Sequence, residues 1–173
     1  MKKMNICKCN LKNLESKITP NIIIKIFTKI YMNYEIDVDY GAKCEKIVII
    51  KLQNHFNNKL TKLDYYDNFD FIDEKQEIYI ELKSRRCKID TYKTTMIGMN
   101  KLNMSKILHR KKNNIYFCFY FTDIDYSTTE LYYWKYNVDE LDQLIYKNGG
   151  RVDRGKREIK KYAYIPVDLL IKI

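Results

Sequence analysis

The stretch from Asp67 to Arg86, DNFDFIDEKQEIYIELKSRR, places the strongest constraint on how this chain can fold. Aromatic and aliphatic residues at 69, 71 and 72 lead into a polar turn over 73–76, and a second run leaves the turn at 77–83. Strand-forming residues on both sides of a short polar turn are typical of a β-hairpin. We therefore predict two antiparallel strands here.

The second run alternates in character. Its residues 78, 80 and 82 are apolar, so we expect them to face the core, whereas Glu81 and Lys83 point to the opposite face with Tyr79. A turn centred between residues 74 and 75 places Asn68 opposite Glu81, with Asp70 on the same face. The hairpin is thus predicted to gather Asp70, Glu81 and Lys83 on one surface.

Two carboxylates held together repel each other unless a cation or a proton lies between them. Mg²⁺ prefers one or two protein carboxylates together with water and phosphate oxygens, and a nearby lysine can hold or deprotonate a water molecule. A metal site is the interpretation that we prefer. The alternative is that Glu81 and Lys83 belong to an ordinary solvated strand face.

Asp70, followed after a hairpin by Glu81-Leu82-Lys83, resembles the pattern of the PD-(D/E)XK nuclease superfamily, with Phe69 in place of the proline. The resemblance implies an endonuclease that hydrolyses phosphodiester bonds, most often in DNA, with Mg²⁺ as cofactor and Mn²⁺ as a substitute. It assigns catalysis to Asp70, Glu81 and Lys83 and metal binding to the two carboxylates. It also leaves open a homodimer, because nucleases of this shape often pair to cut both strands.

Glu45 is a third candidate metal ligand. It precedes Val48 and Ile49 by three and four residues, on the apolar stripe of a helix predicted over 42–58 after a break at Asp39 or Gly41. In several branches of the superfamily, a glutamate on the helix before the hairpin completes the metal shell. Glu45 could equally lie at the edge of the stripe and reach solvent or a neighbouring lysine.

Asp64 and Asp67 compete with Asp70 for the ligand role. Asp70 is preferred because apolar residues flank it on both sides, as in the interior of a strand. A turn one residue longer would reverse the facing pattern and bring Asp67 to the site. Residues 60–66 have room for an additional strand.

The remaining pattern predicts the fold class. A helix begins at Thr19-Pro20, another runs over 95–109, strands cover 114–123 and 128–137, and a short helix covers 138–147. We expect an α/β fold, a mixed β-sheet flanked by helices. The resemblance implies a restriction-endonuclease-like αβββαβ core over roughly residues 41–136, within a single domain spanning 1–173 with N- and C-terminal additions.

A net charge of +10 favours a polyanionic partner, with nucleic acid ahead of an anionic membrane surface. The residues expected to contact phosphate are Arg85, Arg86, Lys93, Lys101, Arg151, Arg154 and Arg157. For Lys101 a solvated helix lysine is the preferred alternative, and the segment around 151–161 could be a solvated charged loop.

No apolar run has the length of a membrane span, and the start of the chain lacks the apolar core of a signal peptide. We therefore expect an intracellular protein, in cytoplasm or nucleus, without a membrane partner. Heavy use of Lys, Asn, Ile and Tyr suggests an AT-rich genome such as that of a virus. A second functional hypothesis keeps the fold without catalysis, giving a nucleic-acid-binding or virion-packaged protein.

Overall fold

The computed structural model describes residues 20–123, 128–149 and 160–173, with side chains from residue 35 onward. The chain divides into two compact units, Met1–Asp37 and Val38–Ile173. Its main elements are α2 (Pro20–Phe56), β1 (Leu60–Lys62), β2 (Phe71–Asp73), β3 (Ile78–Arg85), β4 (Thr94–Gly98), α3 (Met99–Arg110), β5 (Asn114–Thr122), β6 (Thr129–Lys135), β7 (Ile145–Gly149), β8 (Lys160–Pro166) and β9 (Ile171–Lys172).

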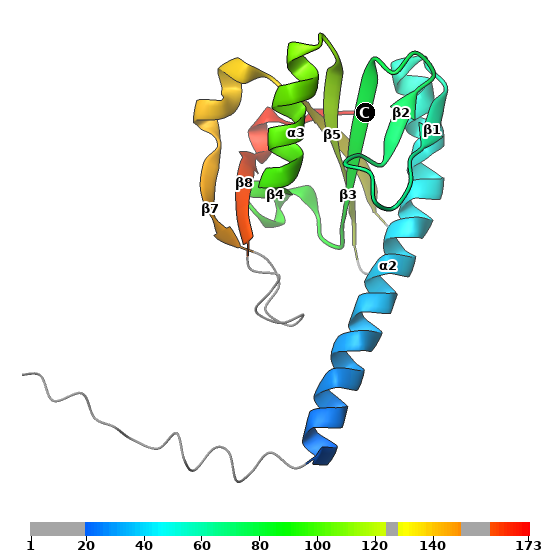
Figure 1. The fold of residues 1–173 in the computed structure, drawn as a ribbon, viewed down its shortest axis with the longest axis vertical. Helices are drawn as coiled ribbons and strands as arrows, with labels where there is room; N and C mark the ends of the chain where they lie inside the picture. Colours follow the sequence, from blue (N-terminus) through cyan, green and yellow to red (C-terminus); the bar gives the residue numbers. More distant parts are fainter. Residues whose placement is uncertain (1–19, 124–127, 150–159) are drawn as a thin grey trace, which may run out of the picture. The chain divides into compact units, whose positions relative to one another are not determined.

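Six strands form the larger sheet, in the order β1-β2-β3-β5-β6-β9 (Figure 1). Among the strand pairs that the structure describes in this sheet, only β3–β5 is parallel, and the chain passes between these two strands through β4 and α3. The predicted α/β class with a mixed sheet flanked by helices is confirmed. β5 has buried residues on both faces, as expected of a central strand.

Helices cover both faces of the larger sheet. On one face, Cys44, Val48 and Leu52 of α2 pack against Ile80 and Leu82 of β3. On the other face, α3 and a second sheet contribute to a core that is rich in aromatic residues. The buried members of this core include Ile97, Leu102, Phe117, Phe119, Phe121, Trp134, Ala163 and Ile165. The hairpin strand β3 is therefore enclosed between two packed layers.

The second sheet has the order β4-β8-β7 and was not predicted (Figure 1). The helix predicted over 95–109 begins only at Met99, because residues 94–98 pair with β8. The helix predicted over 138–147 is also wrong, since a 3₁₀ helix over Val138–Gln143 gives way to β7. Pairing with β8 overrides the local helical pattern at both places, across a long stretch of chain for β4 and between consecutive strands for β7.

The helix break predicted at Asp39 or Gly41 is wrong, although the predicted start at Pro20 is confirmed. Within Val38–Ile173, buried residues Tyr40, Cys44 and Val48 follow each other at intervals of four, so the apolar stripe continues across the glycine. A single helical glycine costs about 1 kcal/mol, which such packing outweighs. No helix among the described residues is both long and apolar enough to cross a membrane.

Candidate active site

The hairpin is formed by β2 and β3, but its register differs from the prediction by two residues. Phe71 lies opposite Ile80, so the strand pairing points Asp70, and not Asn68, toward Glu81. The turn lies further along the chain because Gln76 adopts a positive φ of 58° and its N–H donates to the Asp73 carbonyl. A shift by an even number of residues keeps each side chain on its predicted face.

Asp70 lies just before β2, and its carboxylate is held against β3. Its Oδ2 accepts a hydrogen bond from the backbone N–H of Leu82 at 2.6 Å. Burial, followed by the charge of Glu81, raises the pKa of Asp70 to about 6, and the charge of Glu45 acts in the same direction. Lys83 and the Leu82 N–H oppose this shift in pKa without cancelling it. Asp70 is therefore a largely desolvated carboxyl group beside a second carboxylate.

Glu81 is buried, with only 1% of its surface exposed, which corrects the expectation that its strand face leaves the core. Its Oε1 forms an ion pair with the Lys83 ammonium, and its Oε2 lies 3.0 Å from Nζ of Lys101 in α3. Oε2 is buried and has no hydrogen bond among the described residues. Glu81 is thus a buried carboxylate between two lysines, one from its own strand and one from the covering helix.

Lys101 is turned toward the site and away from bulk solvent, with 19% of its side chain exposed. Besides approaching Glu81, its Nζ donates to the backbone carbonyl of Asn68 at 2.5 Å. It therefore links α3 to the segment that precedes β2. This geometry differs from the solvated helix lysine that the sequence favoured.

Glu45 is partly exposed and pairs with a lysine, as its edge-of-stripe alternative allowed, but this lysine comes from β1 and not from α2. Its Oε2 lies 2.5 Å from Nζ of Lys62 in β1. The described residues contain no group of three or more His, Cys, Asp or Glu side chains arranged to hold a metal ion, so Glu45 does not join Asp70 and Glu81 in a ready-made ligand shell. The negative charge of Glu45 nevertheless acts on the site, because it helps to raise the pKa of Asp70.

The reserve candidates Asp64 and Asp67 lie together in an exposed turn. Asp67 Oδ2 accepts a hydrogen bond from the Asp64 N–H at 2.9 Å, and the backbone N–H of Asp67 donates to the Asp64 carbonyl at 3.0 Å. Both side chains are exposed. Neither takes the place of Asp70 against β3.

A cavity of about 590 Å³ opens over Glu81 and Lys83. Its other lining residues are Gly98, Met99, Asn100, Lys101, Lys160, Lys161 and Tyr162. The last three come from β8 and reach the site because β8 pairs with β4, with Tyr162 opposite Gly98. The sequence placed Lys160 and Lys161 in a basic segment expected to bind phosphate, from the density of lysine and arginine there, but it did not bring this segment or Tyr162 to Glu81. The cavity combines a carboxylate with four lysines and suits an anionic ligand.

The other residues predicted to contact phosphate are dispersed. The Arg85 guanidinium donates to the Met96 carbonyl, while Arg86 lies over the Tyr40 ring at 4.1 Å from the ring centroid. Lys93 is exposed beside the start of β4. Three further predicted residues, Arg151, Arg154 and Arg157, lie outside the described residues.

The mixed sheet, the helices on both of its faces and a Glu-x-Lys sequence in β3 beside Asp70 define a restriction-endonuclease-like α/β protein. A family model described as "Phage putative PDDEXK endonuclease" matches residues 27–173. This chain belongs to that family. Comparison with curated proteins gives no match.

Proposed function

We propose that this chain is a Mg²⁺-dependent endonuclease that hydrolyses phosphodiester bonds in DNA. The observation that carries the proposal is the meeting of Asp70, Glu81 and Lys83 around one backbone segment of β3, beneath a cavity lined with lysines. The net charge of +10 supports a nucleic-acid substrate. A phage-type family fits a virus-encoded nuclease.

The carboxylates present fit a divalent cation. Burial and the charge of Glu81 raise the pKa of Asp70, and a cation bound at this carboxylate would offset both effects. Oε2 of Glu81 is buried, has no hydrogen bond among the described residues and faces only the Lys101 ammonium, at 3.0 Å. Asp70 and Glu81 would hold Mg²⁺ or its substitute Mn²⁺, leaving positions for water and phosphate. A bound ion of this kind supplies Lewis-acid polarisation of a phosphate and lowers the pKa of water.

The lysines have distinct parts in this proposal. Lys83 shares the cavity with Glu81, and 31% of its side chain is exposed, so its Nζ can reach both the carboxylate and an entering phosphodiester. There it would orient a water molecule and neutralise charge that develops on the phosphate oxygens. Lys160 and Lys161, on the β8 wall, would contact neighbouring phosphates.

A second candidate function has its own supporting observation. Lys83 and Lys101 each approach one carboxylate oxygen of Glu81, so this charge is neutralised without any metal. A protein that keeps this arrangement would bind nucleic acid through its lysines without cutting it. Uptake of Mg²⁺ in a calorimetric titration separates the two functions, because only the nuclease requires it.

The test of the proposed function is cleavage of linear, circular, branched and single-stranded DNA in Mg²⁺ by the full chain and three variants. Glu81→Gln and Lys83→Ala should each lower the cleavage rate by about 100-fold or more. Lys75→Ala, an exposed lysine in the hairpin turn, is the matched control and should cut normally. Equal rates for wild type and the two site variants would refute the nuclease. DNA binding without cleavage or Mg²⁺ uptake would favour the second function.

A further inference from the structure

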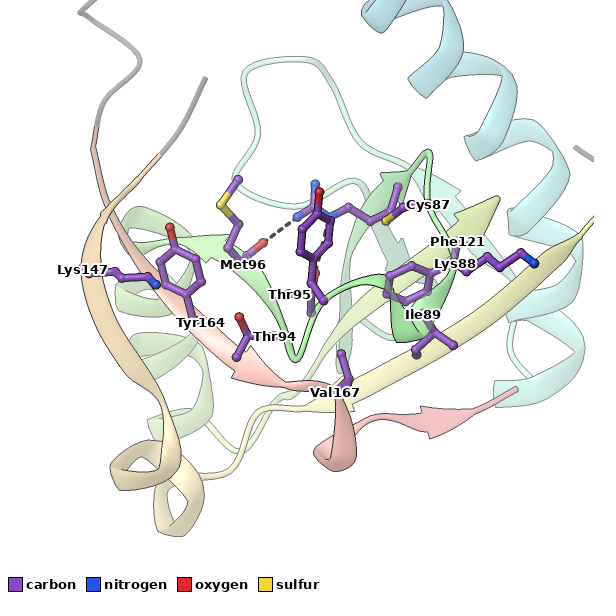
Figure 2. Close-up of a pocket in the computed structure, with 12 residues that line it drawn as sticks. Cys87, Lys88, Ile89, Thr94, Thr95, Met96, Phe121, Lys147, Tyr164 and Val167 are labelled. Atoms are coloured by element: carbon purple, nitrogen blue, oxygen red, sulfur yellow. Dashed lines mark hydrogen bonds between the residues drawn. The ribbon is translucent and has the colours of Figure 1, made fainter. Parts of the chain in front are cut away.

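A second cavity, of about 380 Å³, lies between the two sheets (Figure 2). Phe121 of β5 and Tyr164 of β8 contribute aromatic rings, and Ile89 and Val167 extend the apolar surface, as the labelled side chains show. Tyr92 also lines the cavity and is 66% exposed. The volume falls in the range of about 300–1,000 Å³ that is usual for small-molecule sites.

This cavity is adjacent to the proposed active site because the same strands build both. On β3, Lys83 lines the first cavity and Arg85 lines the second. On the covering sheet, the pair Gly98–Tyr162 borders the first cavity and the pair Met96–Tyr164 borders the second. Positions two residues apart on a strand are separated by about 7 Å. A ligand that extends along β3 can therefore occupy both cavities.

Arg85 gives the second cavity a partly buried positive charge. Its Nη2 donates to the Met96 carbonyl at 2.7 Å and its Nε lies 3.4 Å from Thr95 Oγ1, and both acceptors are neutral. No ion pair joins it to a carboxylate in the part of the chain that the structure describes. Removing a cation from water without a counter-charge is costly even when burial is partial, and desolvation lowers the pKa of this guanidinium. An anionic ligand would offset that cost.

A second cation lies at the cavity wall. Nζ of Lys147 lies 4.4 Å from the centroid of the Tyr164 ring, and Figure 2 shows the two side chains meeting beside β8. The cavity thus combines aromatic and apolar surface with positive charge. A flat aromatic group bearing an anion matches both properties.

We propose that this cavity binds one nucleotide, with its base against the aromatic and apolar surface and its phosphate at Arg85. The choice of a nucleotide over other aromatic anions rests on the proposed function. The nucleotide belongs to the strand being cut, next to the phosphodiester at Glu81 and Lys83, or is free in solution. Both sources share one chemistry, and the experiment separates them.

The test is isothermal titration calorimetry of the full chain in EDTA with deoxyadenosine 5′-monophosphate, deoxyadenosine, inorganic phosphate and a short single-stranded oligonucleotide. The monophosphate should bind more tightly than the nucleoside or phosphate. Tyr92→Ala should weaken its binding about tenfold, as expected for loss of a stacked base. Arg85→Met should make the monophosphate and the nucleoside bind equally. Tyr66→Ala, a tyrosine that is 95% exposed and absent from the cavity lining, is the control and should bind normally.

If the oligonucleotide binds more tightly than the monophosphate, and Tyr92→Ala weakens its binding by the same factor, the cavity binds a nucleotide of the DNA strand. If the oligonucleotide binds more weakly than the monophosphate, the cavity binds a free nucleotide. Undetectable binding of the monophosphate by wild type, or unchanged affinity in Tyr92→Ala, overturns the proposal. Lys83→Ala keeps the two proposals separate, because it should abolish cleavage while leaving monophosphate binding intact. If the wild-type chain binds the monophosphate in this way but cuts no DNA, the nucleotide site is supported and the proposed nuclease activity is refuted.

Discussion

The carboxylate of Asp70 takes the place of a backbone acceptor opposite Leu82, whose N–H it binds at 2.6 Å. The backbone N–H of Asp70 donates to the Ile80 carbonyl at 2.9 Å, so main chain and side chain of one residue extend the hairpin ladder. This double attachment fixes the carboxylate just before the start of β2, close to Glu81. The position of Asp70 is therefore set by β3 as much as by its own segment.

Asp70→Asn should separate the charge of this side chain from its hydrogen bond, because asparagine can accept the same bond from Leu82. In the metal-free protein the folded pKa of about 6 lies above the ordinary value of 3.8. The protonated form therefore stabilises the fold, fully below about pH 4, and this contribution disappears as the pH rises through 6. We expect wild type and variant to be similar near pH 4 and the variant to be more stable by about 2–3 kcal/mol near pH 7.

Urea denaturation at several pH values in EDTA measures this difference. Asp67→Asn, in the exposed turn nearby, is the control and should follow wild type throughout. A difference between Asp70→Asn and wild type that does not change with pH would contradict the assignment of the raised pKa.

Mg²⁺ should stabilise the protein more at pH 7.5 than at pH 5. Protons compete with the ion for Asp70 as the pH falls below the pKa of about 6. Thermal unfolding with Mg²⁺ and with EDTA, at matched ionic strength, gives the shift in Tm. Asp70→Asn should lose most of this shift, and a shift of equal size in that variant would show that the ion binds elsewhere.

Lys83 and Lys101 should be strongly coupled energetically through Glu81. Either ammonium alone still neutralises the buried carboxylate, whereas the double variant leaves that charge without a partner. Replacing both lysines by methionine should lower the free energy of unfolding by about 1–3 kcal/mol more than the sum of the single changes. A double-mutant cycle by chemical denaturation checks this, and the coupling should vanish in a Glu81→Gln background. Additive losses would contradict the shared role.

Gly41→Ala should stabilise the protein. Gly41 lies inside α2, and a Cβ added there would meet no other atom within 4 Å. Alanine is favoured over glycine within a helix by about 0.5–1 kcal/mol. Chemical denaturation should show a gain of this size, and a loss would indicate that the helix needs a flexible position near residue 41.

Local sequence patterns were sufficient to predict the two central strands of the larger sheet. β5 is apolar on both faces, and β3 alternates, so their strand character could be predicted from residues 78–85 and 114–122 alone. The hairpin register could not be predicted, because it depends on Gln76 adopting a positive φ that glycine or asparagine more often adopts. Because the register differs from the prediction by two residues, each side chain of the hairpin stays on its predicted face.

The covering layer of the candidate site was hidden from sequence reasoning. Burial of Glu81 depends on α3, whose Lys101 reaches across to it, and the alternation in β3 cannot report what packs on top. The β8 wall of the cavity exists because residues 160–166 pair with residues 94–98, a contact between distant segments without a local pattern. Long-range pairing of this kind is set by the whole fold.

The order of the strands along the chain also has a consequence for synthesis. The ribosome releases the segments that carry Asp70, Glu81 and Lys83, and all of α3, before it makes β8. β8 supplies Lys160 and Lys161 to the cavity and pairs with the whole of β4. A nascent polypeptide therefore contains Asp70 and Glu81 before β8, which forms one wall of the cavity, has been synthesised. Since β8 completes the cavity, a cell producing this protein meets a finished site only after translation has passed Pro166.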